Sequence, residues 1–252
     1  MFTHHRTQGF ILGKTDRGEY DRVFTIYTKD FGKLELLAKA ERKIKSKLRG
    51  GLELFYLSDI EFIQGKAYKT LTDAILIDDF KALRKDLERL VIAYKVSEVF
   101  DKLVRGQEPD EKIWKLLSEV FGKLNNSPFG ILYYYFLWNF LSLLGYQPAL
   151  YFCSGCRKKL TLGNIYFNFK AGGLICSHCQ KGEEDKSSSS PITDRVSLVR
   201  RGDINPNAIK IIRLVLKKDW QVLKKLKFSE EDLKSLKIFS KQYFLEILEQ
   251  TE

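Results

Sequence analysis

Residues 8–55 have the sequence QGFILGKTDRGEYDRVFTIYTKDFGKLELLAKAERKIKSKLRGGLELF. Short runs of β-branched and aromatic residues alternate in this stretch with clusters of Asp, Gly, Lys and Arg. Leu34 and Leu36 share one face of such a run, and Phe24 and Ile26 share one face of another. A period of two predicts half-buried β-strands, and no helical stripe competes with it.

Five runs of this kind are complete by about residue 73, over residues 10–15, 22–28, 33–39, 52–63 and 67–73. None of the connections between them is long enough for a crossover helix, which favours an antiparallel Greek-key barrel over a parallel sheet. The count of strands fits an OB-type barrel. We therefore predict an OB-fold nucleic-acid-binding domain over residues 1–78.

The hydrophobic period becomes helical downstream of residue 78. Apolar residues at steps of three and four predict a helix with one apolar stripe, made of Leu83, Leu87, Leu90, Val91 and Tyr94. A second helix is predicted behind Pro109. We expect an α+β multidomain protein, with the five-stranded antiparallel barrel followed by an α-helical domain over residues 79–252.

Capping residues predict where three further helices begin. Ser127–Pro128 is expected to start a central core helix, Asn205–Pro206 the next, and Ser229 with Asp232 forms a capping-box pattern for the last. The aromatic side chains of the central helix could stack on bases, but their helical spacing in so apolar a segment favours core packing; they are Tyr133, Tyr134, Tyr135 and Trp138.

Four cysteines form two CxxC pairs, at 153–156 and 176–179, separated by nineteen residues. This spacing predicts one structural Zn²⁺ in a zinc-finger insertion over residues 150–182, bound by Cys153, Cys156, Cys176 and Cys179. A full thiolate set leaves no open coordination position for catalysis. His178 is expected to be exposed or to lie outside the ligand set. A redox-active pair or four free thiols are the alternatives.

The chain has 43 Lys and Arg against 32 Asp and Glu, a formal net charge of +11, which attracts polyanions. We call residues 39–49, between the third and fourth predicted strands, the basic loop. Its cations surround the single acid Glu41 and are the predicted nucleic-acid-binding residues: Lys39, Arg42, Lys43, Lys45, Lys47 and Arg49. An ordinary solvated charged loop is the alternative. A second, weaker candidate surface comprises Arg200, Arg201, Lys210 and Arg213.

Several motifs of other function classes are absent from the sequence. It has no phosphate-binding GxxxxGK[ST] loop, no GxGxxG and no HExxH, and its acids are not grouped as in a metal-dependent nuclease or transferase. We predict that the protein is not an enzyme. The first residues lack a signal-peptide pattern, and the apolar residues 131–144 are too few to span a bilayer, so we expect a cytoplasmic protein with no membrane partner.

Several segments of the sequence are familiar as a set: residues 8–55, which are the most specific part, KTLTDAIL at 69–76, the long helix after Asp79, LWNFLSLLGYQP at 137–148 and the CxxC pairs. Through these segments the chain resembles the RecO family of bacterial recombination mediators over nearly its whole length. The resemblance implies the same barrel, helical domain and zinc insertion, with the basic barrel surface at residues 39–49 and the metal ligands at the four cysteines.

The resemblance also implies a function in DNA repair and recombination. Family members bind single- and double-stranded DNA, anneal complementary strands and, with RecR, help to load RecA on DNA coated by single-strand-binding protein, whose acidic C-terminal tail docks on the helical domain. A functional link to RecF and a nucleoid-associated location in the bacterial cytoplasm are implied as well. A zinc-ribbon RNA-binding or translation-associated module is the alternative that shares the charge and the cysteines.

If all six cations of the basic loop contact phosphates of a single strand, affinity will fall steeply with salt. Each contact releases a counterion and contributes ~0.7 to the slope of log affinity against log salt, so the expected slope is about −4. Titrations of a single-stranded oligonucleotide at several salt concentrations measure it. A slope near zero would exclude phosphate contacts.

Overall fold

The computed structural model describes residues 3–65, 68–126, 130–161, 165–169, 171–180, 202–203 and 205–251. The chain forms two compact units, Met1–Phe136 and Leu137–Glu252, which are described one at a time. The predicted division into domains at residue 79 stays a prediction.

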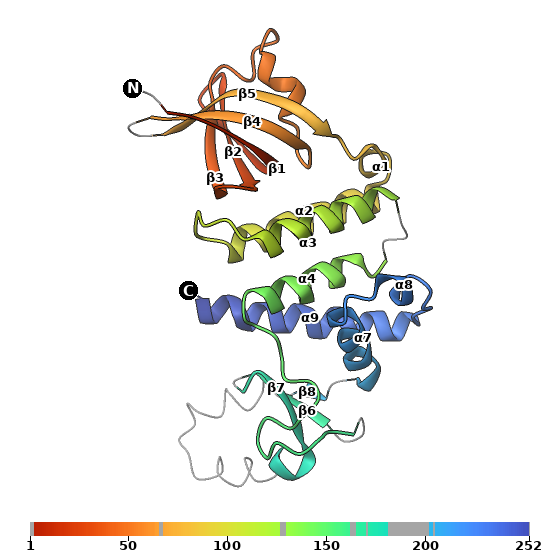
Figure 1. The fold of residues 1–252 in the computed structure, drawn as a ribbon. Helices are drawn as coiled ribbons and strands as arrows, with labels where there is room; N and C mark the ends of the chain where they lie inside the picture. Colours follow the sequence, from red (N-terminus) through yellow and green to blue (C-terminus); the bar gives the residue numbers. More distant parts are fainter. Residues whose placement is uncertain are drawn as a thin grey trace. The chain divides into compact units, whose positions relative to one another are not determined.

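The first unit begins with a closed barrel of five strands, shown in red to yellow in Figure 1. The strands follow the order β1-β2-β3-β5-β4, and all neighbours are antiparallel except the closing pair β3 and β5, which is parallel. Their bounds are His4–Arg17 (β1), Asp21–Thr28 (β2), Gly32–Ala38 (β3), Leu57–Gln64 (β4) and Lys69–Asp78 (β5). The predicted five-stranded OB-type barrel is confirmed.

The barrel core is made by the faces that the period of two predicted. Phe24, Ile26, Leu34 and Leu36 are all buried inside it, together with residues of β4 and β5. Where β1 pairs with β2, a Cβ added to Gly9 would lie 2.5 Å from Cγ2 of Ile26. Glycine at this position therefore lets β1 pass close enough to pair with both β2 and β4.

The fourth strand begins later than predicted, at Leu57 rather than Leu52. A 3-10 helix, η1 (Lys47–Gly51), precedes a turn in which Phe55 has a φ of 66°. The hydroxyl of Ser58 donates to the Gly51 carbonyl at 2.7 Å and fixes this turn. Leu52 and Phe55 are buried from the turn, so their hydrophobicity indicates burial and not an extended backbone.

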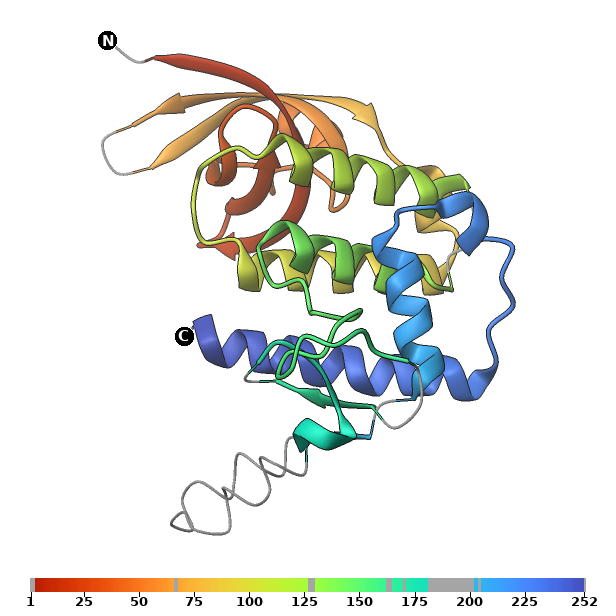
Figure 2. The ribbon, with the colours of Figure 1, turned by 60° about the horizontal axis from the view of Figure 1, so that its bottom comes forward.

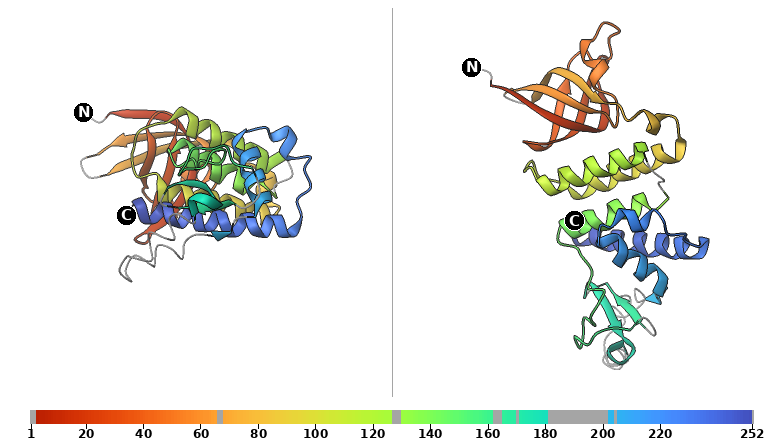
Figure 3. Two further views of the ribbon diagram at one scale, coloured as in Figure 1. Left: turned by 90° about the horizontal axis from the view of Figure 1, so that it is seen from below. Right: turned by 45° about the vertical axis from the view of Figure 1, so that its right-hand side comes forward.

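Three helices follow the barrel in the first unit: α1 (Lys81–Arg84), α2 (Leu87–Leu103) and α3 (Glu111–Asn126). Helices α2 and α3 lie side by side in Figures 1 and 3. The predicted apolar stripe on α2 is wrong, because Leu87 is 75% exposed and Val91 and Tyr94 are exposed as well. The helix buries the opposite face, which includes Val96 and Phe100.

The barrel packs on these helices through aromatic rings. The Phe10 ring of β1 lies 5.0 Å from Trp114 and 5.3 Å from Phe121 of α3, centroid to centroid. Tyr27 of β2 meets Phe100 of α2 edge to face at 4.9 Å. Barrel and helices α2 and α3 therefore share one aromatic layer inside the first unit.

The second unit contains the long C-terminal helix α9 (Glu230–Thr251), with α7 (Pro206–Leu216) crossing it and the short α8 (Trp220–Leu223) packed on α7 (Figure 2). The side chain of Asn205 accepts from the backbone of Asn207, and Ser229 accepts from the backbone of Asp232 at 3.1 Å. The predicted helix starts at Asn205 and Ser229 are thereby confirmed.

Helix α4 (Leu132–Leu143) begins in the first unit and ends in the second. Within the second unit, Trp138 stacks on Tyr243 of α9 at 5.0 Å and donates from Nε1 to Ser240 at 3.0 Å. Trp138 is fully buried, as core packing predicts. The predicted start, Ser127–Pro128, lies outside the described residues.

A small sheet carries the cysteine region of the second unit. Its strands are β6 (Ile165–Asn168), β7 (Gly173–Cys176) and β8 (Gly202–Asp203), in the order β7-β6-β8 (Figure 1). Phe167 of β6 meets Phe239 of α9 at 4.9 Å, which attaches the sheet to the helix. Among the described residues, no helix is long and apolar enough to cross a membrane.

Candidate metal centre and nucleic-acid interface

The first cysteine pair lies in a tight turn. The backbone N–H of Cys153 donates to the carbonyl of Lys158 at 2.8 Å, and Arg157 donates to the Cys153 carbonyl at 2.9 Å. A Cβ at Gly155 would lie 3.0 Å from Sγ of Cys179, so only the smallest residue leaves the second cysteine pair its room. The turn thus points both of its thiols at the second pair.

The second cysteine pair joins the end of β7 to a helical turn at residues 177–180. The backbone N–H of Cys176 donates to Sγ of Cys153 at 3.4 Å, across the two pairs. Ser154 donates from its backbone to the Leu174 carbonyl at 2.8 Å. These hydrogen bonds hold the two CxxC segments against each other.

The four sulfur atoms have the spacing of a tetrahedral metal site. All lie within 4.8 Å of one another, and Sγ of Cys176 is 3.8 Å from Sγ of both Cys153 and Cys156. A disulfide would need ~2.05 Å, whereas ligands at ~2.3 Å from a tetrahedral Zn²⁺ lie ~3.8 Å apart. The four cysteines therefore fit a metal ion and do not form disulfides.

The protonation of these thiols is unequal without a cation. Burial raises the pKa of Cys153, but backbone N–H groups of Cys156, Cys176 and Gly155 outweigh it and lower that pKa to about 6. Burial and hydrogen bonds among the other cysteine sulfurs raise the pKa of Cys179 to about 12. A divalent cation would supply the charge that allows all four thiolates to exist together.

The histidines stand apart from this cluster. His178 is exposed and does not belong to the ligand set, as expected. His4 and His5 lie in β1, where the His5 ring stacks on Phe62 at 5.2 Å and His4 shares a hydrogen bond with Glu61 at 2.8 Å.

The basic loop is fixed to the barrel by its one acid. Glu41 is buried and accepts from the guanidinium of Arg22 on β2 at 3.0 Å. Arg22 donates to Asp16 of β1 as well, at 2.7 Å, which lowers the pKa of Asp16 through that hydrogen bond. The Ala40 backbone, at a φ of 53°, donates to Asp21 at 2.7 Å. These contacts therefore fix the start of the loop to the barrel, and the carboxylate of Glu41 is buried.

The predicted nucleic-acid-binding side chains of the loop are all exposed: Lys39, Arg42, Lys43, Lys45, Lys47 and Arg49. Arg42 is 3.4 Å from Asp16, and the Lys43 ammonium lies over the Tyr20 ring at 4.9 Å. Within the part of the chain that the structure describes, none of the other four takes part in an ion pair. Their charge is available to an anion.

The second predicted basic surface is described only in part, because Arg200 and Arg201 lie outside the described residues. Lys210 is exposed and donates to Asn207 at 3.2 Å. Arg213 donates to the Leu150 carbonyl and lies over the Tyr151 ring at 4.6 Å. Its guanidinium thus supports the segment that leads into the first cysteine pair, and its contact with nucleic acid stays a prediction.

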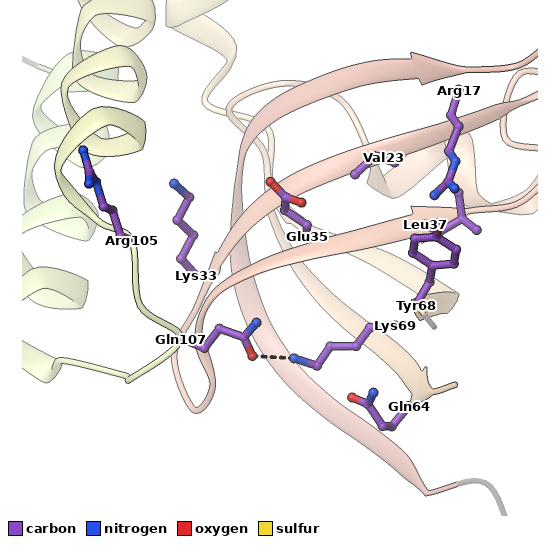
Figure 4. A pocket seen from close by; sticks show the side chains of 10 residues that line it. All are labelled: Arg17, Val23, Lys33, Glu35, Leu37, Gln64, Tyr68, Lys69, Arg105 and Gln107. Atoms are coloured by element: carbon purple, nitrogen blue, oxygen red, sulfur yellow. Dashed lines mark hydrogen bonds between the residues drawn. The ribbon is translucent and has the colours of Figure 1, made fainter. Parts of the chain in front are cut away.

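The first unit has a further cationic feature that was not predicted from the sequence. A groove of about 600 Å³ lies along β3 in the first unit (Figure 4). We call it the barrel groove; the residues important here are Arg17, Lys33, Tyr68, Lys69, Arg105 and Gln107. Glu35 is the one acid in its lining.

The barrel groove lies between connections that OB folds commonly use for ligands. Arg17 ends β1 beside the first turn, and Tyr68 and Lys69 follow the turn between β4 and β5. Oligonucleotides bind OB folds at these two loops. Cations and an aromatic residue at the two loops were therefore a sequence signal from which this site could have been predicted. Arg105 and Gln107 come from the α2–α3 connection, and only the tertiary fold brings them to the groove.

Together, the closed OB-type barrel, the basic loop and the four-thiol cluster define an OB-barrel protein with a four-cysteine insertion. Two family models match the chain: Recombination protein O N terminal over residues 1–80, and Recombination protein O C terminal over residues 84–251. The chain belongs to the RecO family and is a bacterial-type DNA repair protein of that family.

Curated relatives agree over nearly the full length. The chain is 31% identical to a DNA repair protein RecO of Dehalococcoides mccartyi, over 92% of this chain and 86% of the relative. It is 28% identical to the DNA repair protein RecO of Acetivibrio thermocellus, over 97% of this chain and 92% of the relative.

The cluster geometry predicts that loss of one thiol releases the metal, whereas loss of the neighbouring histidine does not. Cys179→Ser removes one of four ligands, so the purified variant should contain far less than one metal ion per chain. His178→Asn should keep a full complement, because the imidazole is exposed and outside the cluster. Elemental analysis of protein expressed with ample zinc measures both. Equal metal loss in the two variants would contradict the four-thiolate site.

Proposed function

We propose that the protein is a recombination mediator that binds single- and double-stranded DNA and anneals complementary strands. The observation that carries the proposal is the basic loop, whose six cations are exposed while its one acid is buried against Arg22. A surface of this composition neutralises phosphates without sequence readout. Family membership supports DNA as the polyanion.

Annealing needs no covalent step in this account. Two strands repel each other through their phosphates, and cations on a fixed loop lower that repulsion. Base pairing then supplies the free energy. Because the Glu41–Arg22 ion pair anchors the loop, its cations are presented without a large ordering cost on binding. We assign no catalytic residue.

The cysteine cluster has a separate, structural role in the proposal. Cys153, Cys156, Cys176 and Cys179 would hold one Zn²⁺, which supplies cross-links between two CxxC turns. With all ligand positions taken by thiolates, the ion would have no open position for water or substrate. The described strands around the cluster are short and few. Metal binding would therefore supply part of the free energy that keeps this segment folded.

The proposed partners follow from the family. They are RecR, with which the protein would help to load RecA on DNA coated by single-strand-binding protein, and the acidic C-terminal tail of that protein, for which the net charge of +11 is favourable. A functional link to RecF and a nucleoid-associated location in the cytoplasm belong to the same proposal, as does the division into an OB domain and a helical domain near residue 79.

Removal of three loop charges tests the proposal. The variant Lys43→Gln, Lys45→Gln, Lys47→Gln should fold normally, because all three side chains are exposed. It should lose strand annealing, and the slope of its log affinity for a single strand against log salt should become shallower by about 2. Annealing of two labelled complementary oligonucleotides by fluorescence transfer gives the rate.

A matched triple variant controls for net charge. Lys234→Gln, Lys237→Gln, Lys241→Gln removes the same charge from exposed positions of α9 and should anneal nearly as the unchanged protein does. Equal annealing by both variants would contradict the basic-loop assignment. RNA oligonucleotides at the same salt concentration separate a DNA protein from an RNA-binding module.

A further inference from the structure

The barrel groove contains an aromatic ring with an open face. Tyr68 lies just after the turn between β4 and β5, and the guanidinium of Arg17 covers its ring at 4.1 Å from the centroid. The Tyr68 residue nevertheless remains 52% exposed. With one face covered and half of the residue exposed, the other face is available to a planar group such as a base.

Cations flank this ring within the same groove. Arg105 is exposed, and Lys69 donates to Oε1 of Gln107 at 2.6 Å, which holds its ammonium in the groove (Figure 4). Lys33 is instead neutralised by Asp101, 2.8 Å from its ammonium. The charges available to a phosphate are therefore those of Arg17, Lys69 and Arg105. A volume of about 600 Å³ is that of a small-ligand site and accommodates few unpaired nucleotides.

The groove leads directly into the basic loop. Lys33, Glu35 and Leu37 alternate along β3 and line the groove, and Lys39, next in that alternation, is the first cation of the loop. At ~3.3 Å per residue, Lys33 and Lys39 lie about 20 Å apart along the chain. Arg17 and Asp16 link the two features from β1, because Asp16 contacts Arg42 while Arg17 covers Tyr68.

A base in a duplex has both faces stacked on its neighbours, so it can reach Tyr68 only by leaving the helix. A base in a single strand carries no such cost. We propose that the barrel groove is a single-strand subsite, in which one unpaired base stacks on Tyr68 and the adjacent phosphates contact Arg17, Lys69 and Arg105. The strand then continues along β3 to the basic loop, whereas a duplex contacts the loop alone.

This inference rests on the proposed DNA-binding function and gives its barrel surface a second, selective part. The two parts differ in chemistry: the loop contacts phosphates of any DNA, and the groove requires a free base. A protein that anneals strands gains from this difference, because the paired product loses the Tyr68 contact and is released more easily than the single-stranded substrate.

The test compares Tyr68→Ala with Tyr68→Phe in the full chain. Affinities are measured at one salt concentration for a single strand, a duplex of equal length and a single strand built of abasic nucleotides. Tyr68→Ala should weaken single-strand binding by about 5- to 150-fold, the range of one base–aromatic stack. Duplex and abasic-strand binding should stay within about twofold, and Tyr68→Phe should match the unchanged protein in all three.

Three outcomes would overturn the subsite: no change in single-strand affinity, an equal loss for single strand and duplex, or an equal loss for the abasic strand. Lys112→Gln, an exposed cation of α3 outside the groove and the loop, controls for general charge. The loop triple variant, run in parallel, should weaken binding of all three ligands. If that variant binds normally, the proposed function fails, whatever Tyr68→Ala does; if only Tyr68→Ala binds normally, the subsite alone fails.

Discussion

Closure of the barrel by the pairing of β3 with β5 is the constraint on which the proposed DNA-binding surface depends. The two strands pair in parallel over only two positions, Leu36 with Lys69 and Leu37 with Thr70. This pairing leaves no open sheet edge and seals the core formed by Leu36 and its neighbours. It also places Tyr68 and Lys69 beside β3, which creates the barrel groove. The chain leaves β3 directly into the basic loop, so both cationic features follow from this one contact between strands.

A buried acid then gives the basic loop its direction. The sequence shows Glu41 as the lone anion among six cations, and its sequence position alone indicates only a lower net charge for the loop. In the structure its carboxylate is buried and held by Arg22, and it forms no ion pair with a loop cation among the described residues. A buried charge is tolerated only with a partner, and Arg22 has a second partner in Asp16. The result is a loop whose anion is used for anchoring and whose cations face solvent.

Local patterns predicted those features that depend on near neighbours in the chain. Alternation found the strands, and CxxC spacing found four thiols that the fold does bring together. Features set by tertiary contacts were missed or wrong. Leu52 and Phe55 are buried from a turn, which hydrophobicity alone cannot distinguish from a strand. Helix α2 carries apolar residues on two faces. The face that includes Phe100 packs against the barrel and α3, and the face that contains Leu87 is exposed. The barrel groove joins β1, β3, β5 and the α2–α3 connection, so no local pattern contains it.

We propose that the barrel of the first unit holds DNA, while the metal site stabilises the second unit. Backbone hydrogen exchange, read by mass spectrometry with and without a saturating single strand, tests it most directly because it reports every segment of one unmodified protein. We expect slower exchange in β3, in the basic loop and at the start of β5, with residues 150–180 unchanged. Slower exchange confined to residues 150–180 and α7, with an unchanged barrel, would contradict it.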